Sequence, residues 1–525
     1  MEVPLLVDDF LLRAAALYPD KTAIVDGERR YSYREFQERV NRLAHALRAL
    51  GIARGDRVCI LSPNSHFFLE SFYGTAQIGA ILVPLNYRLV PQDHEYIINH
   101  AGVRVVLVDP EFTGVVDEIR AKLTTVEHFV VAADESEAPD GWSDWEQLIA
   151  AAAATPTPAA ERQENDLVSI NYTSGTTARP KGVMLTHRNC YLNALTMTAH
   201  LRIGHDDVDL WTLPMFHCNG WGVVYALTGM GGTHVVLRTV DDKLMFQLIE
   251  REGVTLACMA PAVLQRLLEY PDRAKHAIRT RPRLVVAGAP PPAAFIERLE
   301  TELGWEFIEI YGHTETAPLL TVSQPDFNTR ADDWPRRSRA GVPAIGVELV
   351  LRDDADALVP KDGQSVGEVC ARTNVVMAGY WEQPDETAKA IRDGYFHTGD
   401  LAVWDETGSI HIVDRKKDVI ISGGENISSP EIEDALYQHP AVLECAVIGV
   451  PHEKWGETPL ALVVLRPGHS ASAGDLIDFC RQSLAHFKCP TSVQFTDALP
   501  RTATGKLQKF KLREQYWQGG ERRVN

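Results

Sequence analysis

Tyr172–Gly182 (YTSGTTARPKG) combines residue types that suit a polyphosphate ligand. Its glycines and short side chains let backbone N–H groups approach a ligand closely, while the hydroxyls add hydrogen-bond partners and Lys181 adds a positive charge. The stretch is not a Walker A loop, because the pattern G-x-x-x-x-G-K-[ST] is absent from it. The preceding residues, Leu167–Tyr172, are typical of a short buried strand. We therefore expect a phosphate-binding loop at the end of a strand, where α/β sheets bind ligands.

This loop resembles the phosphate-binding loop of the adenylate-forming superfamily, which includes acyl-CoA synthetases, luciferases and peptide-synthetase adenylation domains. The superfamily pattern is [ST]-S-G-[ST]-[ST]-G-x-P-K-G. The residues that match it are Thr173, Ser174, Gly175, Thr176, Thr177, Pro180, Lys181 and Gly182. Ala178 departs from the pattern, since the family usually has Gly there and Ala resists a positive φ. The resemblance implies that Thr173–Lys181 hold the β- and γ-phosphates of ATP.

Five further segments resemble superfamily motifs and follow the order that the family requires. The first, Tyr311–Pro318 (YGHTETAP), resembles the motif Y-G-x-T-E. It implies that the Tyr311 ring packs on adenine, that Thr314 contacts phosphate, and that Glu315 binds Mg²⁺. One carboxylate suits this metal, because Mg²⁺ takes one or two carboxylates together with phosphate oxygens. This motif also assigns Gly312 and His313 to the nucleotide site. A weaker match, to the segment that lines adenine, adds Gly288, Ala289 and Pro290.

Tyr395–Leu401 (YFHTGDL) resembles the motif [YWF]-x-[ST]-G-D, whose aspartate is Asp400 here. The resemblance implies that Asp400 accepts both ribose hydroxyls, a task that suits the two acceptor oxygens of a carboxylate. Asp414–Asp418 (DRKKD) resembles the next motif. In that motif Arg415 reaches the ribose or phosphate, and Asp414 is the hinge between two domains.

Two segments near the C-terminus resemble the parts that exchange places during the family's reaction. Ser422–Pro430 (SGGENISSP) resembles the loop beside the thiol nucleophile, which implies that Gly423, Gly424 and Glu425 contact coenzyme A. Pro500–Leu507 (PRTATGKL) resembles P-[RK]-T-x-[ST]-G-K, which makes Lys506 the catalytic lysine of adenylation.

Pro214–Trp221 (PMFHCNGW) resembles the P-[LM]-F-H motif of the acyl pocket in fatty-acyl-CoA synthetases and related acyl-activating enzymes. The resemblance implies that His217 lies near the substrate carboxylate and that Trp221 walls or gates the tail pocket. An alkyl tail needs an apolar lining. A single methylene contributes only ~1–3 kcal/mol of discrimination, so several acids could be used.

The elements that must position these residues follow an α/β rhythm. Ser32 and Glu35 form a capping box before a helical apolar pattern, and strand-like runs follow at Arg57–Ser62 and Val103–Val108. We expect Val375–Tyr395 to be an irregular, turn-rich connection. Such alternation predicts doubly wound α/β layers.

The last part of the chain has a different character. Val403–Val413 predicts a hairpin, and strands at Glu444–Val450 and Leu460–Leu465 with a helix at Ala473–Phe487 predict a small α+β unit. The predicted fold is α/β. It has a large N-terminal domain (1–413) of doubly wound layers with a β-barrel-like subdomain, and a small mobile C-terminal α+β domain (414–525).

Composition narrows the function classes. The formal net charge of −19 argues against general nucleic-acid or anionic-membrane binding. The sequence contains no run of about 18 apolar residues, so we expect no integral membrane segment. The N-terminal stretch lacks the basic region of a secretory signal. The eight cysteines form no C-x-x-C pair, which favours reduced core thiols in a cytoplasm over zinc ligands or disulfides. A homodimer is left open.

The leading prediction is an ATP-dependent acyl-CoA synthetase that converts a carboxylic acid, first of all a medium- or long-chain fatty acid, to acyl-CoA. The implied cofactors are ATP, Mg²⁺ and coenzyme A, and the products of the first step are an acyl-adenylate and pyrophosphate. Three alternatives stay open: a CoA ligase for an aryl or short thioether acid, a luciferase-like monooxygenase, and a non-catalytic acyl-nucleotide binder. A separate carrier protein could replace free coenzyme A.

Overall fold

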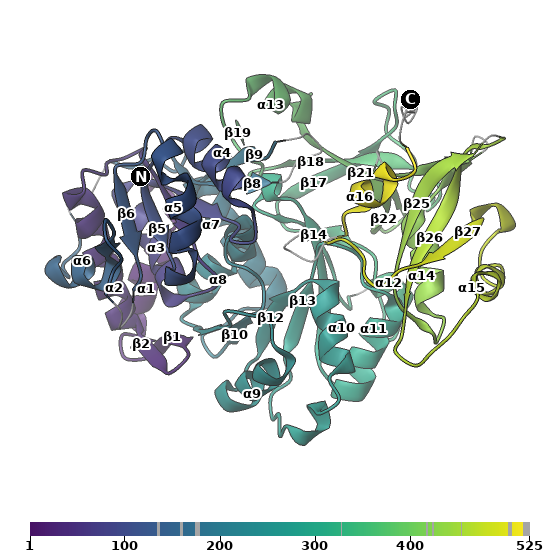
Figure 1. Cartoon of the computed structure of the whole chain (residues 1–525), viewed down its shortest axis with the longest axis horizontal. Helices are drawn as coiled ribbons and strands as arrows, with labels where there is room; N and C mark the ends of the chain where they lie inside the picture. The colour runs from purple at the N-terminus through teal and green to yellow at the C-terminus, as the bar shows by residue number, and fades with distance from the viewer. Residues whose placement is uncertain are drawn as a thin grey trace.

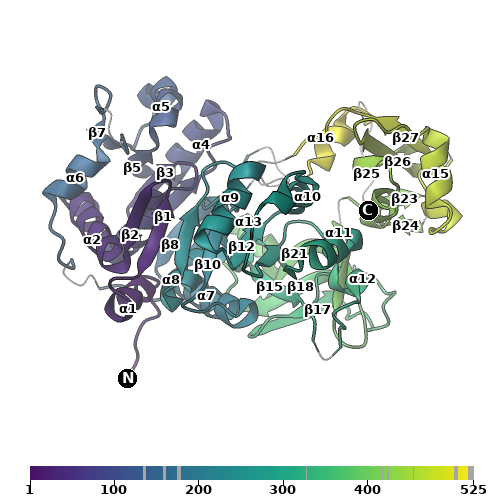
Figure 2. The same cartoon turned by 90° about the horizontal axis from the view of Figure 1, so that it is seen from below.

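The computed structural model of the chain describes residues 1–133, 137–157, 161–173, 179–326, 328–415, 418–422, 425–452, 454–501 and 507–517. Figure 1 shows a large N-terminal body with a smaller C-terminal unit beside it, and Figure 2 shows the same arrangement from below. Four sheets are formed within the described residues. This arrangement confirms the predicted α/β fold with a large N-terminal and a small C-terminal domain.

The first sheet is mostly parallel, with antiparallel strands at its two ends. Its strands, in spatial order, are β16 (Val342–Pro343), β15 (Leu319–Ser323), β14 (Glu306–Gly312), β13 (Arg283–Val286), β12 (Leu256–Met259), β10 (Val208–Trp211), β11 (Thr233–Val236), β1 (Thr22–Asp26) and β2 (Arg29–Ser32). Because β13 and β14 run parallel, their carboxyl ends lie at one edge of the sheet.

The second sheet is also mostly parallel, but it has antiparallel pairs at one end only. Its strands, in spatial order, are β19 (Gly379–Tyr380), β9 (Lys181–Thr186), β8 (Leu167–Thr173), β4 (Ile81–Leu85), β3 (Arg57–Leu61), β5 (Val103–Val108), β6 (His128–Val131) and β7 (Ser143–Asp144). The antiparallel pair β8–β9 flanks the sequence of the phosphate loop. The strand expected before that loop is therefore present, and it runs one residue further, to Thr173.

Helices cover and connect these two sheets. The helices of the N-terminal part are α1 (Asp9–Leu17), α2 (Tyr33–Ala49), α3 (His66–Ile78), α4 (Pro91–Ala101), α5 (Thr113–Ile119), α6 (Trp145–Ala151), α7 (His187–Leu201), α8 (Val223–Met230), α9 (Asp242–Glu252), α10 (Pro261–Glu269), α11 (Ala293–Arg298), α12 (Trp334–Arg337) and α13 (Pro384–Ala390). The predicted capping box is formed, because Ser32 accepts from the Glu35 N–H and the Glu35 carboxylate accepts from the Ser32 N–H.

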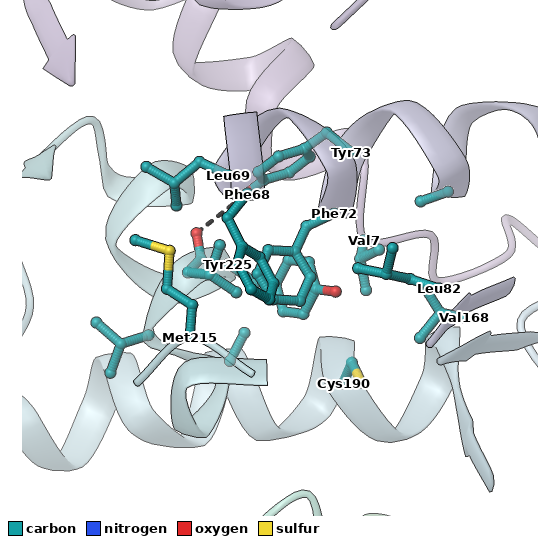
Figure 3. Packing of buried hydrophobic residues seen from close by; sticks show 14 of the residues in the cluster. Val7, Phe68, Leu69, Phe72, Tyr73, Leu82, Val168, Cys190, Met215 and Tyr225 are labelled. Atoms are coloured by element: carbon teal, nitrogen blue, oxygen red, sulfur yellow. Dashed lines mark hydrogen bonds between the residues drawn. The ribbon is translucent and has the colours of Figure 1, made fainter. Parts of the chain in front are cut away.

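The largest apolar cluster of the molecule lies around α3. Every residue of α3 is buried, and its cluster includes residues of both parallel sheets. In Figure 3, Phe68 and Phe72 of α3 meet Tyr225 of α8, with Leu82 of β4 and Val168 of β8 beside them. Burying aromatic side chains of this size stabilises the fold by ~1.5–3 kcal/mol each, which fixes the two sheets relative to one another.

Two further sheets complete the fold, one antiparallel and the other mostly antiparallel. The first corresponds to the expected barrel-like subdomain, and its strands are β17 (Val347–Arg352), β18 (Gly367–Thr373), β20 (Ile391–Arg392), β21 (Tyr395–Trp404) and β22 (Ile410–Arg415). The C-terminal elements are β23 (Ile420–Ser422), β24 (Glu425–Ile427), α14 (Ser429–Tyr437), β25 (Val442–His452), β26 (Gly456–Leu465), α15 (Ala473–Cys480), β27 (Ser492–Phe495) and α16 (Lys509–Glu514). The hairpin predicted over Val403–Val413 is the β21–β22 pair.

Two local expectations differ from the structure. The segment Val375–Tyr395 is not irregular throughout, since it contains β19, α13 and β20. Pro384 starts α13 at a position that needs no N–H donor, a signal that marks a helix start. The predicted helix Ala473–Phe487 ends earlier, at Cys480, where tighter i→i−3 turn bonds such as Gln482 N–H to the Phe479 carbonyl take over.

The cysteine side chains lie in the core, as the sequence predicts. All eight cysteines are buried and unpaired with one another. Among the described residues, no helix is both long and apolar enough to cross a membrane.

Candidate functional site

The carboxyl end of β14, the middle of β21 and the end of β22 bring four side chains together, which we call the nucleoside cluster: Tyr311, His313, Asp400 and Arg415. The Tyr311 hydroxyl donates to Asp400 Oδ2 at 2.9 Å, and His313 Nε2 lies 3.1 Å from the same oxygen. Arg415 Nε lies 3.8 Å from Asp400 Oδ1, because Asp400 and Arg415 are paired across β21 and β22. Asp400 lies 89 positions after Tyr311, so the two side chains meet only in the folded chain.

Asp400 is the anionic centre of this cluster. Its residue is only 7% exposed. Burial raises the pKa of the Asp400 carboxyl, but the His313 ring and the Arg415 guanidinium outweigh burial, so the net pKa shift is downward. Burial, followed by the neighbouring Asp400 charge, raises the pKa of the Tyr311 hydroxyl well above its ordinary value. At neutral pH the site therefore holds a carboxylate with a neutral tyrosine donor.

The end of β14 also requires glycine at position 312. A Cβ built on Gly312 would stand 1.6 Å from the Pro318 carbonyl oxygen, far inside contact distance. The His313 N–H donates to that same carbonyl at 3.1 Å, so the close approach holds the turn that follows the strand. Gly312 thus fixes where His313 and Glu315 leave the sheet.

A second group, the phosphate cluster, consists of Lys181, Glu315, Tyr380 and Glu386. The Tyr380 hydroxyl donates to Glu315 Oε1 at 2.9 Å. The Lys181 ammonium forms an ion pair with Glu386 and lies 5.0 Å from the centre of the Tyr380 ring. Pairing between β19 and β9 sets Tyr380 opposite Val183, two residues beyond Lys181.

The residues of the phosphate cluster suit a magnesium–polyphosphate ligand. The described residues contain no group of three or more His, Cys, Asp or Glu side chains placed to hold a metal by themselves. A Mg²⁺ ion that shares phosphate oxygens needs only one or two carboxylates, and Glu315 supplies one beside the Lys181 ammonium. When bound, the metal would neutralise phosphate charge.

The acyl segment, His217–Gly222, has an unusual backbone. Cys218, Asn219, Gly220 and Trp221 all have positive φ, between 46° and 56°. This conformation costs roughly 1–2 kcal/mol for each residue other than glycine, so it needs outside support. Asn219 Nδ2 donates to Ser169 Oγ at 2.8 Å, and Asn193 Nδ2 donates to the Trp221 carbonyl at 3.1 Å. Strain held in this way is characteristic of functional segments.

These three groups meet around residue 314. The Cys218 thiol of the acyl segment lies 3.9 Å from the Thr314 carbonyl oxygen, between His313 of the nucleoside cluster and Glu315 of the phosphate cluster. Trp221 is buried and His217 partly exposed. The predicted adenine-lining residues Gly288, Ala289 and Pro290 are exposed and begin two residues after the end of β13, at the sheet edge where β14 also ends.

Several predicted site residues lie outside the described residues. They are Ser174, Gly175, Thr176, Thr177, Gly423, Gly424 and Lys506, together with Ala178. The backbone of Glu425 begins β24, and Thr173 ends β8. The roles of these residues stay predictions.

Sequence reasoning missed Tyr380 and Glu386, which lie in the segment expected to be an irregular connection. Only the Pro384 helix start could have indicated order there. It also missed Asn193, which supports the acyl segment, and Asn171, whose Nδ2 donates to Asn219 Oδ1 at 3.0 Å. A buried asparagine inside a helix (Asn193) or a strand (Asn171) gives no pattern by which its distant partner could be found.

The proposed hinge, Asp414, is buried at the end of β22 and bonded into the C-terminal unit. Its Oδ2 accepts from the Ser429 N–H at 3.2 Å and from the Ser429 hydroxyl at 2.5 Å. Elsewhere the two parts touch through Gln265 Nε2, which donates to the Leu443 carbonyl at 2.9 Å, and through the rings of Phe295 and Tyr437, which meet edge-on. The Asp414 carboxylate thus caps the start of α14 from the preceding unit.

Known proteins resemble the chain over nearly its whole length. It is 38% identical to 4-hydroxybutyrate–CoA ligase 2 of Metallosphaera sedula, over 96% of this chain and 93% of that protein. It is 36% identical to the peroxisomal benzoate–CoA ligase of Arabidopsis thaliana, over 98% and 93%. It is 38% identical to the long-chain-fatty-acid–CoA ligase of Thermus thermophilus, over 98% and 96%.

Solved structures and family patterns agree with these relatives. The anthranilate CoA ligase AuaEII in complex with anthranoyl-AMP has a TM-score of 0.91 at 29% identity, covering 98% of both chains. ATP-bound MatB from Rhodopseudomonas palustris has a TM-score of 0.87 at 31% identity, covering 98% of this chain and 99% of that one. The AMP-binding enzyme pattern matches residues 11–381, and the pattern of the AMP-binding enzyme C-terminal domain matches residues 431–506. The chain therefore belongs to the AMP-binding enzyme family, which confirms the predicted acid–thiol ligase that works through an adenylate with ATP, Mg²⁺ and coenzyme A.

Proposed function

We propose that this CoA ligase is an acyl-CoA synthetase for monocarboxylic acids with an uncharged tail, and that medium- or long-chain fatty acids are its first candidate substrates. The observation that carries the proposal is the meeting of the nucleoside cluster, the phosphate cluster and the acyl segment around Thr314. A carboxylate bound at the acyl segment would face the α-phosphate of a nucleotide held by the other two groups.

In the first half-reaction, the substrate carboxylate attacks the α-phosphorus of ATP and pyrophosphate leaves. The Asp400 carboxylate accepts the ribose hydroxyls, and the Tyr311 ring packs on adenine. Lys181 and the phosphate loop hold the β- and γ-phosphates, Thr314 contacts phosphate, and Glu315 would hold the metal. Catalysis of this step is mostly positioning and charge stabilisation, for which Lys506 supplies a cation.

In the second half-reaction, the thiolate of coenzyme A attacks the acyl carbonyl and AMP leaves. Lys506 must then withdraw, and the loop of Gly423, Gly424 and Glu425 must arrive, since one crevice does not hold both. Rotation of residues 414–525 about Asp414 meets this need as a gating motion. The hydrogen bonds from Ser429 to Asp414 support a pivot there, because they keep α14 attached to the hinge.

The acyl segment supports an apolar tail. Met215, Phe216 and Trp221 are buried around it, and Phe216 meets the Tyr87 ring edge-on at 5.6 Å between ring centres. A second candidate class, short and aryl acids, is favoured by the names of the benzoate and 4-hydroxybutyrate ligases among the relatives.

A panel of acids tests the proposal. Saturated acids from C2 to C18, benzoate and cinnamate are each scored by AMP release with and without coenzyme A, with Lys506→Ala as the matched inactive control. CoA-dependent release that peaks at C8 or longer supports fatty acids, and a peak at C4 or benzoate supports the second class. Absence of acid-dependent AMP release across the panel refutes the function.

Location and assembly are two further predictions. We expect a cytoplasmic enzyme, to be checked by fractionation, although the benzoate–CoA ligase among the relatives is named peroxisomal. A homodimer would be seen as twice the mass of one chain in light scattering.

A further inference from the structure

The phosphate cluster already contains an anion opposite its lysine. The Glu386 carboxylate pairs with Lys181, the residue that ends the phosphate loop. The Lys181 side chain is 15% exposed and that of Glu386 is 30% exposed, so the pair is partly shielded from water. The Lys181 hydrogen bond, followed by that of Lys389, lowers the pKa of Glu386 to about 2. Glu386 is therefore ionised throughout the neutral range.

The fold holds this carboxylate in place from several sides. Glu386 lies in the first turn of α13, where the helix dipole favours an acid. The next residue, Thr387, accepts from the Tyr380 N–H at 2.8 Å. The Trp381 N–H donates to the Gly182 carbonyl at 2.7 Å, which ties this segment to the strand that carries Lys181. The hydrogen bonds of the Tyr380 and Trp381 N–H groups therefore hold Glu386 close to Lys181.

A polyphosphate and Glu386 would compete for the same ammonium. Two anions within reach of one cation repel each other, and a phosphate that binds Lys181 takes the place of the carboxylate. Glu386 has a second partner, since Lys389 Nζ lies 2.7 Å from its Oε1. Glu386 therefore keeps a cation partner when Lys181 leaves it, which lowers the free-energy cost of the exchange.

We propose that Glu386 is a resident counter-ion that Lys181 exchanges for the β- and γ-phosphates of ATP and takes back when pyrophosphate leaves. This inference rests on the proposed function, because it assumes that Lys181 holds those phosphates. Glu386 then acts as a positioning residue that weakens the binding of ATP and pyrophosphate but leaves the binding of AMP unchanged, since AMP has neither phosphate. It shortens the time for which pyrophosphate stays bound after adenylation.

Calorimetry of the full-length protein tests this exchange. The affinities for AMP, for the non-hydrolysable α,β-methylene ATP and for pyrophosphate are measured with Mg²⁺ for the wild type, Glu386→Gln and Asp385→Asn. Asp385 is an exposed acid one residue earlier on α13, so its neutralisation controls for the general change in charge. We expect Glu386→Gln to bind the ATP analogue and pyrophosphate about two- to fivefold more tightly, as a partly exposed ion pair implies, with AMP affinity unchanged.

A second variant reverses the effect. Lys389→Gln removes one of the two cations that contact Glu386 in the described residues and leaves Lys181 as the other. Glu386 should then hold Lys181 more firmly, so the variant should bind both polyphosphates more weakly relative to AMP. Two results would overturn the exchange while leaving the proposed function intact. One is an equal change of polyphosphate affinity in Glu386→Gln and Asp385→Asn, and the other is a change of AMP affinity in Glu386→Gln as large as that for the ATP analogue. A wild type that binds none of the three ligands would overturn both.

Discussion

Replacing Asp400 by asparagine tests whether the nucleoside cluster binds ribose. The change keeps the shape of the side chain but removes its charge and one of its two acceptor oxygens. In the wild type this buried carboxylate accepts from the Tyr311 hydroxyl at 2.9 Å and lies 3.8 Å from Arg415 Nε. Asparagine can keep the Tyr311 bond through its single oxygen, so the ribose loses its partner.

The size of the effect follows from the bonds that are lost. A hydrogen bond to a charged group contributes ~1.5–3 kcal/mol, and Asp400→Asn removes about one such bond and weakens another. We therefore expect kcat/KM for ATP to fall by roughly 30- to 140-fold, which corresponds to ~2–3 kcal/mol. The KM for the acid should change little, because Asp400 does not belong to the acyl segment.

ATP–pyrophosphate exchange with two nucleotides provides the assay. The analogue 2′,3′-dideoxy-ATP lacks both ribose hydroxyls. With it, the kcat/KM of the wild type should fall by most of the factor expected for Asp400→Asn, and the kcat/KM of the variant should fall little further. The ratio of wild type to Asp400→Asn should then fall to about threefold or less. If the ratio stays as large for dideoxy-ATP as for ATP, Asp400 acts on the structure of the site and the ribose assignment is wrong.

Three other predictions address the division of labour and the titration of an acid on α14. Lys506→Ala should slow ATP–pyrophosphate exchange by ~10²–10³ yet leave thioester formation from supplied acyl-AMP largely intact. Gly424→Trp should do the reverse, because an indole would fill the path of the pantetheine arm. Burial, followed by the neighbouring Glu433, raises the pKa of Asp434 to about 7, so ionising it destabilises the fold increasingly from about pH 4 to pH 7. Asp434→Asn should therefore raise the melting temperature by about 2–4 °C at pH 8 and by less at pH 5.

Each of these has a result that contradicts it. If Lys506→Ala slows both half-reactions equally, Lys506 does not act in adenylation alone. A normal coenzyme A step in Gly424→Trp rules out the pantetheine path. A melting-temperature gain for Asp434→Asn that is the same at pH 5 and pH 8 shows that the carboxyl does not titrate as its surroundings imply.

Local sequence was enough for features whose partners are a few residues away. The Ser32–Glu35 capping box and the β21–β22 hairpin formed as predicted, because their interactions are decided within one turn or one reversal of the chain. The end of the Ala473 helix was misjudged, since helix length depends on the packing of its apolar face as much as on propensity.

The sequence by itself determined the family, the α/β fold and the order of the nucleotide motifs, because a motif carries its chemistry in consecutive residues. Only the tertiary structure decided which side chains act on those motifs from elsewhere. Glu386 reaches Lys181 across 205 positions, and Tyr380 reaches Glu315 across 65. Such partners are set by the pairing of β19 with β9, and strand pairing between distant segments leaves no periodic signal in either of them.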